Sequence, residues 1–198
     1  MPDDLVVLTG QAADALADAR IAAVLVGPGL GRDDDAAARL QAALESGHPL
    51  VLDADALHLL RPAMLRGRAA PLLLTPHAGE LAALCQAFEI AAEGKVAQTQ
   101  ALAAATSAVV IAKGADTIIA DPAGDLVFTQ AASSWLSVAG TGDVLAGLVA
   151  SRLASGAAPV AAAEEALWLH ATAARQAGPA LLPDTLIAAL PAAWEQAV

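Results

Sequence analysis

The stretch "PLVLDADALHLL", residues 49–60, shows the pattern that decides the fold of this chain. A short apolar run ends at an aspartate, and a segment of helical character follows it. Apolar runs of similar length recur at 22–26 ("AAVLV"), 71–75 ("PLLLT") and 108–112 ("AVVIA"). Each run has the length and the leucine or β-branched content of a strand, so the sequence predicts a sheet of short strands.

Helix-like segments separate these runs, at 33–46, 78–88 and 94–106. Strands that alternate with helices predict an α/β fold, in which a mostly parallel central sheet carries helices on both faces. Residues 116–130 ("DTIIADPAGDLVFTQ") predict two further strands joined by a turn. The pattern is helical from Asp143 onward, with helices expected at 143–155, 158–177 and 184–196.

The sequence contains no internal repeat or linker, so residues 1–198 are expected to form a single domain. Open α/β domains usually begin with a strand, a glycine-rich turn and a helix. Residues 1–21 offer instead one weak strand, "LVVL" at 5–8, and an alanine-rich helix. We therefore expect the domain to lack its N-terminal elements.

The composition argues against several classes of protein. Of the 198 residues, 57% are hydrophobic and 16% are charged, which argues against intrinsic disorder. The sequence predicts neither a membrane span nor a signal peptide. The one cysteine, Cys85, fits a reducing compartment, so we expect a cytoplasmic protein in which Cys85 is a small buried apolar residue. The net charge of −11 argues against a nucleic-acid partner, but backbone amides can still hold a small phosphorylated ligand.

Ligands of open α/β sheets bind at the carboxyl ends of the strands, and the first of these ends is rich in glycine. "VGPGLGRDD" (26–34) places three glycines, among them Gly29 and Gly31, before a helix that Asp33 or Asp34 can cap. Glycine lets a ligand approach the backbone closely. A tight turn without a ligand explains this loop equally well.

The next two strand ends carry acids and a histidine. Asp53 is the last residue of its strand, and we expect it to hold a metal-bound water or a sugar hydroxyl, whereas an Asx turn with a helix cap explains Asp55. In "TPHAGE" (75–80), Glu80 suits the positive end of a helix. His77 has no such structural explanation, so we expect it to contact a ligand.

The last two strand ends suggest an anion site. Lys113 directly follows its strand, and a phosphate partner and a solvated lysine explain it equally well. In "SVAGTGDVLAG" (137–147), the triplet "GTG" precedes a helix whose first amides are available to a phosphate. Asp143 would repel that phosphate, so we interpret it as the base that takes a proton from an attacking hydroxyl. The alternative is that Asp143 merely caps the helix.

Taken together, these loops resemble one family. "GPGLG", "DADAL", "TPHAGE", "KGADT" and "AGTGDVLAG" occur in the order and at the approximate spacing of the ADP- or ATP-dependent NAD(P)H-hydrate dehydratases, which belong to the ribokinase-like superfamily. The match runs from Val24 to "LWLHATAA" at 167–174. The resemblance implies a ribokinase-like three-layer sandwich.

The resemblance also implies a repair reaction. Hydrated NADH or NADPH carries a hydroxyl on C6 of its reduced nicotinamide ring, and the enzyme phosphorylates that hydroxyl from ADP or ATP with Mg²⁺. Phosphate is a far better leaving group than hydroxide, and the ring double bond returns as phosphate departs. The resemblance further implies a homo-oligomer and, in the full gene product, fusion to an N-terminal NAD(P)HX epimerase domain.

The residue roles implied by the resemblance fall into four groups. Asp143 matches the catalytic base and also lies at the substrate. The nucleotide is assigned to Lys113, Gly114, Ala115, Asp116, Thr117, Gly140, Thr141 and Gly142. The hydrated dinucleotide is assigned to Gly29, Gly31, Asp53, His77 and Asp143. Glu80 resembles the glutamate that this superfamily associates with magnesium.

The sequence departs from the family in two places, and two rival functions stay open. Ala78 replaces the usual Pro or Glu, and "AASSWLSVAGTGD" (131–143) lacks an Asn-Pro pair and one glycine. Trp135, in that stretch, could line an adenine site or pack against the sheet, and we expect packing. One rival is a small-molecule kinase of the hydroxymethylpyrimidine type, but such kinases have Asn at the position of His77. The other is a nucleotide-binding remnant without turnover.

Overall fold

A computed structural model describes residues 12–197, which contain one sheet of six strands in sequence order. The strands are β1 (Val24–Val26), β2 (Leu50–Leu52), β3 (Leu72–Leu74), β4 (Val109–Ala112), β5 (Ile118–Ala120) and β6 (Leu126–Phe128). Strands β1 to β4 are parallel, and β5 and β6 add an antiparallel hairpin. The mostly parallel sheet and the hairpin are therefore confirmed.

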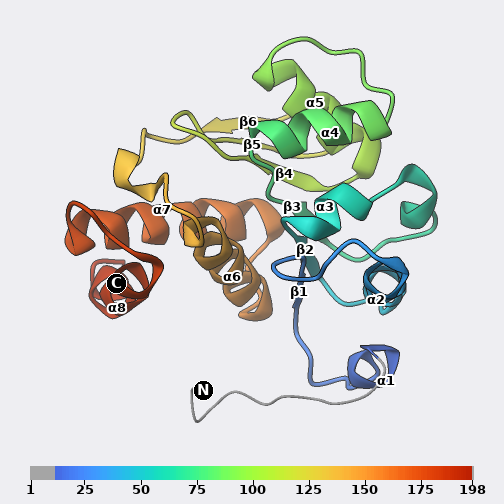
Figure 1. Cartoon of the computed structure of the whole chain (residues 1–198), viewed down its shortest axis with the longest axis horizontal. Helices are drawn as coiled ribbons and strands as arrows, with labels where there is room; N and C mark the ends of the chain where they lie inside the picture. The colour runs from blue at the N-terminus through green and yellow to red at the C-terminus, as the bar shows by residue number, and fades with distance from the viewer. Residues whose placement is uncertain (1–11, 198) are drawn as a thin grey trace.

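Helices cover both faces of the sheet, as expected (Figure 1). They are α1 (Ala12–Leu16), α2 (Asp34–Glu45), α3 (Asp55–Leu59), α4 (Ala78–Ala87), α5 (Lys95–Thr106), α6 (Thr141–Ala154), α7 (Pro159–Ala177) and α8 (Pro183–Glu195), with short 3₁₀ helices η1 (Pro62–Leu65) and η2 (Ser134–Leu136). Helices α2 to α5 lie on one side of the sheet, and α6 to α8 lie on the other. The structure thus has three layers.

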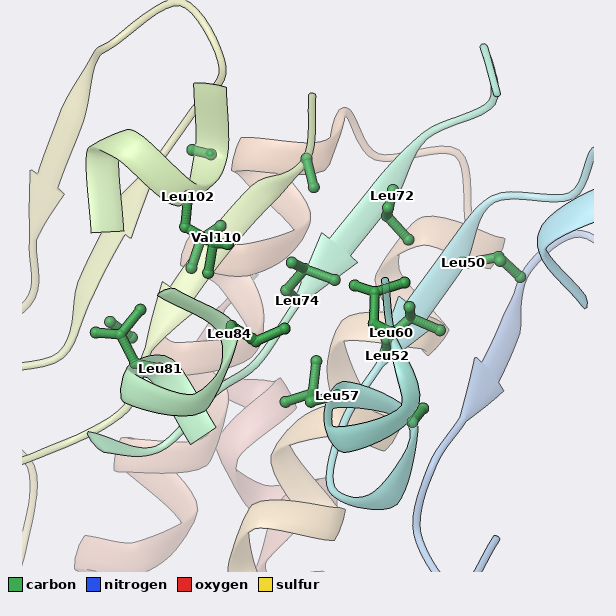
Figure 2. Packing of buried hydrophobic residues seen from close by; sticks show 14 of the residues in the cluster. Leu50, Leu52, Leu57, Leu60, Leu72, Leu74, Leu81, Leu84, Leu102 and Val110 are labelled. Carbon is green, nitrogen blue, oxygen red and sulfur yellow. The ribbon is translucent and has the colours of Figure 1, made fainter. Parts of the chain in front are cut away.

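The core on the α2–α5 side is built mainly from leucine. Alternate strand residues such as Leu50 and Leu52 face this side, while Val51 between them faces the other. Figure 2 shows these leucines meeting those of α3, α4 and α5. Burying each such side chain contributes about 1.5–3 kcal/mol relative to leaving it in water. Cys85 lies in this core as expected, and its burial raises the pKa of the thiol.

The core on the opposite side depends on alanine. Helices α6 and α7 present Ala146, Ala162, Ala166 and Ala173 to the interior, each with almost no exposed surface. Because alanine has a short side chain, these helices can lie close to the sheet and to each other. This close approach places the start of α6 and one face of α7 next to the end of β4, where the candidate site lies.

Three sequence expectations need a comment. Helix α6 begins at Thr141 rather than near Asp143, so Thr141 and Gly142 belong to its first turn. The predicted strand "LVVL" lies outside the described residues, whereas α1 falls within the expected alanine-rich helix. None of the helices in residues 12–197 is both long enough and apolar enough to cross a membrane.

Gly27 provides a test of how closely β1 and β2 approach at their carboxyl ends. It has a φ of +140°, and a Cβ there would lie 1.7 Å from the carbonyl oxygen of Asp53. We predict that Gly27→Ala lowers the free energy of unfolding by well over the roughly 1–2 kcal/mol that left-handed strain alone costs. The measurement is urea unfolding followed by circular dichroism.

Gly156→Ala is the matched control. Gly156 has a φ of +89°, and a Cβ added there would have no other atom within 4 Å, so this substitution adds backbone strain without a clash. Equal losses for the two variants would contradict the close approach at Gly27.

Candidate functional site

A polar row crosses the carboxyl edge of the sheet, where β2, β3 and β4 end side by side. Asp53, Thr75 and Lys113 each directly follow one of these strands. The Thr75 hydroxyl donates to Asp53 Oδ1 at 2.7 Å, and Lys113 Nζ donates to the same oxygen at 2.7 Å. The Asp53 side chain is only 2% exposed and that of Lys113 is 19% exposed. The row is therefore a largely buried ion pair with a hydroxyl donor.

The ammonium of Lys113 also lies against the start of α6. A Cβ on Gly142, the second residue of this helix, would lie 3.4 Å from Lys113 Nζ. The first amides of a helix carry a partial positive charge and have no partner within the helix. Lys113 and the N-terminus of α6 together therefore form a positive site on an otherwise acidic chain.

Hydrogen bonds fix the loop that leads into α6. The Thr141 hydroxyl donates to the carbonyl oxygens of Leu136 (2.6 Å) and Val138 (2.8 Å). From α7, His170 Nε2 lies 2.9 Å from the carbonyl oxygen of Thr141. Burial, opposed in part by this hydrogen bond, lowers the pKa of His170. Because a carbonyl oxygen can only accept, the ring donates its Nε2–H to Thr141.

A cavity of about 530 Å³ opens beside this site, within the range of about 300–1,000 Å³ that is typical of small-molecule pockets. Its walls are the loop after β4, the segment 127–137, the start of α6 and one face of α7. Six of the eight residues predicted to bind the nucleotide line it: Lys113, Gly114, Ala115, Thr117, Thr141 and Gly142.

The other two residues predicted to bind the nucleotide have different surroundings. Asp116 pairs with Lys95 Nζ at 2.8 Å, and this hydrogen bond lowers the pKa of the Asp116 carboxyl. Gly140 has a φ of +92° and packs against α8, since a Cβ there would lie 2.8 Å from Pro183 Cγ. Both residues therefore shape loops next to the cavity instead of forming its wall.

His77 has a structural role that the sequence analysis missed. It is the N-cap of α4, and its Nδ1 accepts hydrogen bonds from the backbone N–H groups of Gly79 (3.0 Å) and Glu80 (3.2 Å). The carboxylate of Glu80 accepts in return from the His77 N–H at 2.8 Å. The expectation that His77 has no structural explanation is wrong, because this reciprocal pair is a capping box.

The glycine loop after β1 is tied to the start of α3. Asp55 Oδ2 accepts from the Gly31 N–H at 3.1 Å, and Oδ1 pairs with Arg32 Nε at 2.7 Å. The hydrogen bond to Arg32 lowers the pKa of Asp55. The interpretation of Asp55 as a helix cap is wrong, since α3 has no side-chain cap, whereas Asp33 does cap α2 as expected.

Asp143 is the third residue of α6, and its side chain is exposed. The N-cap of this helix is Gly140, and within residues 12–197 the Asp143 carboxylate makes no hydrogen bond to a helix amide. The capping alternative for Asp143 therefore has no support in this geometry. The cavity wall contains neither Asp143 nor the residues assigned to the dinucleotide, Gly29, Gly31, Asp53 and His77.

The sequence analysis missed the contribution of α7. Glu164, Trp168, Ala171 and Arg175 form a stripe along this helix that lines the cavity, next to His170. Their spacing of three or four residues is the signal that could have revealed a shared face. The expectation that Trp135 packs against the sheet is also wrong, since Trp135 on η2 is 48% exposed.

The described residues offer no ready-made protein cage for a metal. Within residues 12–197, no three His, Cys, Asp or Glu side chains gather as such a cage requires. Glu80, the residue assigned to magnesium, directs its carboxylate to the α4 cap. A magnesium ion does not need such a cage, because one or two carboxylates, waters and substrate phosphates usually share its coordination.

Comparison with known proteins decides the family. The family model described as NAD(P)H-hydrate dehydratase matches residues 1–191. The chain belongs to this family. The family assignment made from the five sequence motifs is thus confirmed.

Curated relatives support the same assignment. The "Bifunctional NAD(P)H-hydrate repair enzyme Nnr" of Mycobacterium tuberculosis strain CDC 1551 is 45% identical over 139 residues, which cover 69% of this chain and 29% of the relative. The "ADP-dependent (S)-NAD(P)H-hydrate dehydratase" of Xanthomonas campestris pv. campestris is 39% identical over 168 residues, covering 84% of this chain and 57% of the relative. The matched part of this chain therefore spans less than two thirds of the length of either relative.

Solved structures confirm the fold. The ADP/ATP-dependent NAD(P)H-hydrate dehydratase of Bacillus subtilis, co-crystallised with ATP and Mg²⁺, matches with a TM-score of 0.78 and 27% identity, covering 93% of this chain and 69% of that one. A ribokinase-like superfamily protein from Enterococcus faecalis (24% identity, TM-score 0.76, covering 93% and 66%) shares the fold. The predicted ribokinase-like α/β architecture is confirmed.

The capping box generates a prediction about stability. His77→Ala removes the acceptor for the first amides of α4, and we predict a loss of about 1 kcal/mol in the free energy of unfolding. His77→Asp supplies another good N-cap and should restore most of that loss. Thermal unfolding of the three proteins is the measurement. If His77→Ala were as stable as the wild type, the cap would not contribute.

Proposed function

We propose that this chain catalyses the nucleotide-dependent dehydration of hydrated NADH or NADPH. The observation that carries the proposal is the cavity in which Lys113, the glycine start of α6 and the loop after β4 meet. The names of the Xanthomonas and Bacillus relatives support a reaction that depends on ADP or ATP.

The residues of the cavity suit an adenine nucleotide. The Lys113 ammonium and the amides of the first turn of α6 would hold phosphate oxygens, because both offer donors with positive charge. Gly114, Ala115 and Thr117 would bind from the loop after β4. Magnesium, when bound, would neutralise phosphate charge at this point, and a role for Glu80 in holding it stays a prediction.

Asp143 is the proposed base. The C6 hydroxyl oxygen of the hydrated ring attacks the terminal phosphorus of ADP or ATP, and its proton passes to the Asp143 carboxylate. The bond from that phosphorus to the bridging oxygen breaks at the same time, so that AMP or ADP leaves. The phosphorylated ring then loses phosphate by cleavage of its C6–O bond, driven by the lone pair of the ring nitrogen. Loss of a proton from C5 restores the double bond, so that one hydroxyl and one hydrogen leave the ring in total.

The dinucleotide is proposed to lie on the exposed side of the site. Gly31 is held by Asp55 through its backbone N–H, and Gly29 lies in the same loop. His77 is fixed at the start of α4 with 60% of its side chain exposed. His77 follows β3, the neighbour of β4, and the glycine loop follows β1, two strands beyond β3 along the same edge. Fusion to an N-terminal epimerase, a homo-oligomeric state and a cytoplasmic location stay predictions, the first supported by the bifunctional name of the mycobacterial relative.

A product assay tests the proposal. The chain is incubated with hydrated NADH and ADP, and the reduced nicotinamide product and inorganic phosphate are measured together. We expect both in equal amounts. Accumulation of a phosphorylated substrate would indicate a kinase instead, and ADP binding without turnover would indicate a nucleotide-binding remnant.

Gly142 tests the anion site separately. Gly142→Val places branched carbon atoms beside Lys113 Nζ and over the first amides of α6, so ADP affinity should fall about tenfold or more, as expected for the loss of charge-assisted hydrogen bonds. Isothermal titration calorimetry measures the affinity. Gly147→Val, in the same helix with open space around its Cβ position, is the matched control and should bind ADP normally. Unchanged affinity in Gly142→Val would contradict the site.

Asp143 tests the base. Asp143→Asn keeps the shape of the side chain but cannot accept the proton, so turnover should fall by about 10²–10⁴-fold while ADP affinity and melting temperature stay close to wild type. Asp184→Asn, which changes an acid in the first turn of α8, is the control. A variant that melted much lower yet kept its rate would show that Asp143 has only a structural role.

A further inference from the structure

The environment of Asp53 does not suit a group that contacts substrate. Its side chain is 2% exposed, and its Oδ1 accepts from both the Thr75 hydroxyl and Lys113 Nζ at 2.7 Å. It is absent from the wall of the cavity, whereas Lys113 is part of that wall. Asp53 can therefore act on a bound ligand only through its neighbours.

Lys113 needs such a neighbour. Its backbone is fixed, since its N–H donates to the carbonyl oxygen of Pro76 at 2.8 Å, but a lysine side chain is a flexible four-carbon stem. Its ammonium lies next to Gly142, where the positive end of α6 would repel it. The Asp53 carboxylate supplies the opposite charge that keeps the ammonium at this place.

Thr75 completes the arrangement from the strand between them. Its side chain is fully buried, and its hydroxyl donates to Asp53 Oδ1 and, at 3.3 Å, to the carbonyl oxygen of Leu52. This donor fixes the oxygen that receives Lys113. The three side chains thus form a chain of contacts from β3 through β2 to the ammonium that follows β4.

We propose that Asp53 is a positioning residue, which, with Thr75, holds the Lys113 ammonium at the N-terminus of α6 for the phosphates of the nucleotide. The proposal rests on the proposed function and deepens it. It replaces the expectation that Asp53 binds the hydrated dinucleotide. The ion pair of Asp53 and Lys113 is formed before the nucleotide binds, so binding does not bear the entropic cost of ordering the ammonium.

A double-mutant cycle on ADP affinity tests the proposal in the full chain. The variants are Asp53→Asn, Lys113→Met and the two combined, and calorimetry with ADP gives each dissociation constant. Asp53→Asn alone should weaken ADP binding by about 10-fold to 100-fold, the range for a lost hydrogen bond to a charged group. In the Lys113→Met background the same change should have almost no effect, because Asp53 then has no ammonium to hold.

Thr75 provides a second, milder test in case Asp53→Asn does not fold. Thr75→Val keeps the shape of the side chain but removes the donor to Asp53, and ADP binding should weaken several-fold. Thr75→Ser keeps the hydroxyl and should restore wild-type affinity. Melting temperatures of all variants separate a change in affinity from a change in folding.

The outcomes are distinct. The positioning role would be overturned if the double variant lost as much ADP-binding free energy as the Asp53→Asn and Lys113→Met variants lose in sum. It would also be overturned if Thr75→Val bound ADP normally. A loss confined to hydrated dinucleotide affinity would also overturn it, in favour of direct substrate contact. If the wild-type chain failed to bind ADP, the proposed function would fall, and this inference would fall with it.

Discussion

The parallel register of β1 to β4 is the constraint on which the site depends. Val26, Leu52 and Leu74 lie at the same level across three neighbouring strands, so the chain leaves the sheet at one edge after each of them. Asp53 and Lys113 are 60 positions apart in the sequence, yet this register brings their side chains within hydrogen-bond distance. A slip of one residue would turn Leu50 and Leu52 from the leucine core toward the alanine core on the other face, and it would break the pair.

The positive charge of this acidic chain is concentrated beside the cavity. The net charge is −11, but Lys113 and the first turn of α6 concentrate positive potential at one point. Asp53 offsets that potential in the folded chain, and His170 ties α7 to the same turn. The alanine faces of α6 and α7 make this geometry possible, since larger side chains would separate the helices from the sheet.

Much of the fold could be predicted from the sequence because short leucine and valine runs are unambiguous when helices separate them. The loops "KGADT" and "GTG" could also be recognised as candidate ligand-binding loops, since glycine next to Lys113 or before a helix suggests a ligand. The role of α7 could not be recognised from the sequence, because the stripe of Glu164, Trp168 and Arg175 lines a cavity only once the segment 127–137 folds opposite it.

Two errors, at His77 and Asp55, have a physical cause. His77 caps α4 through a ring nitrogen, whereas the residues usually expected at an N-cap are Ser, Thr, Asp and Asn. Asp55 has the right chemistry for a cap, but the loop after β1 offers it Arg32 and the Gly31 amide instead. A tertiary contact of this kind joins positions 23 and 24 residues apart, so it leaves no sign in the local pattern.

A crystal structure of the chain soaked with ADP would test the central claim most directly. The account predicts that the nucleotide fills the cavity beside α7, with a phosphate within hydrogen-bond distance of Lys113 Nζ and of an amide in the first turn of α6. Asp53 should still contact the ammonium in that complex. A nucleotide bound elsewhere, or phosphates that contact neither Lys113 nor α6, would contradict the account.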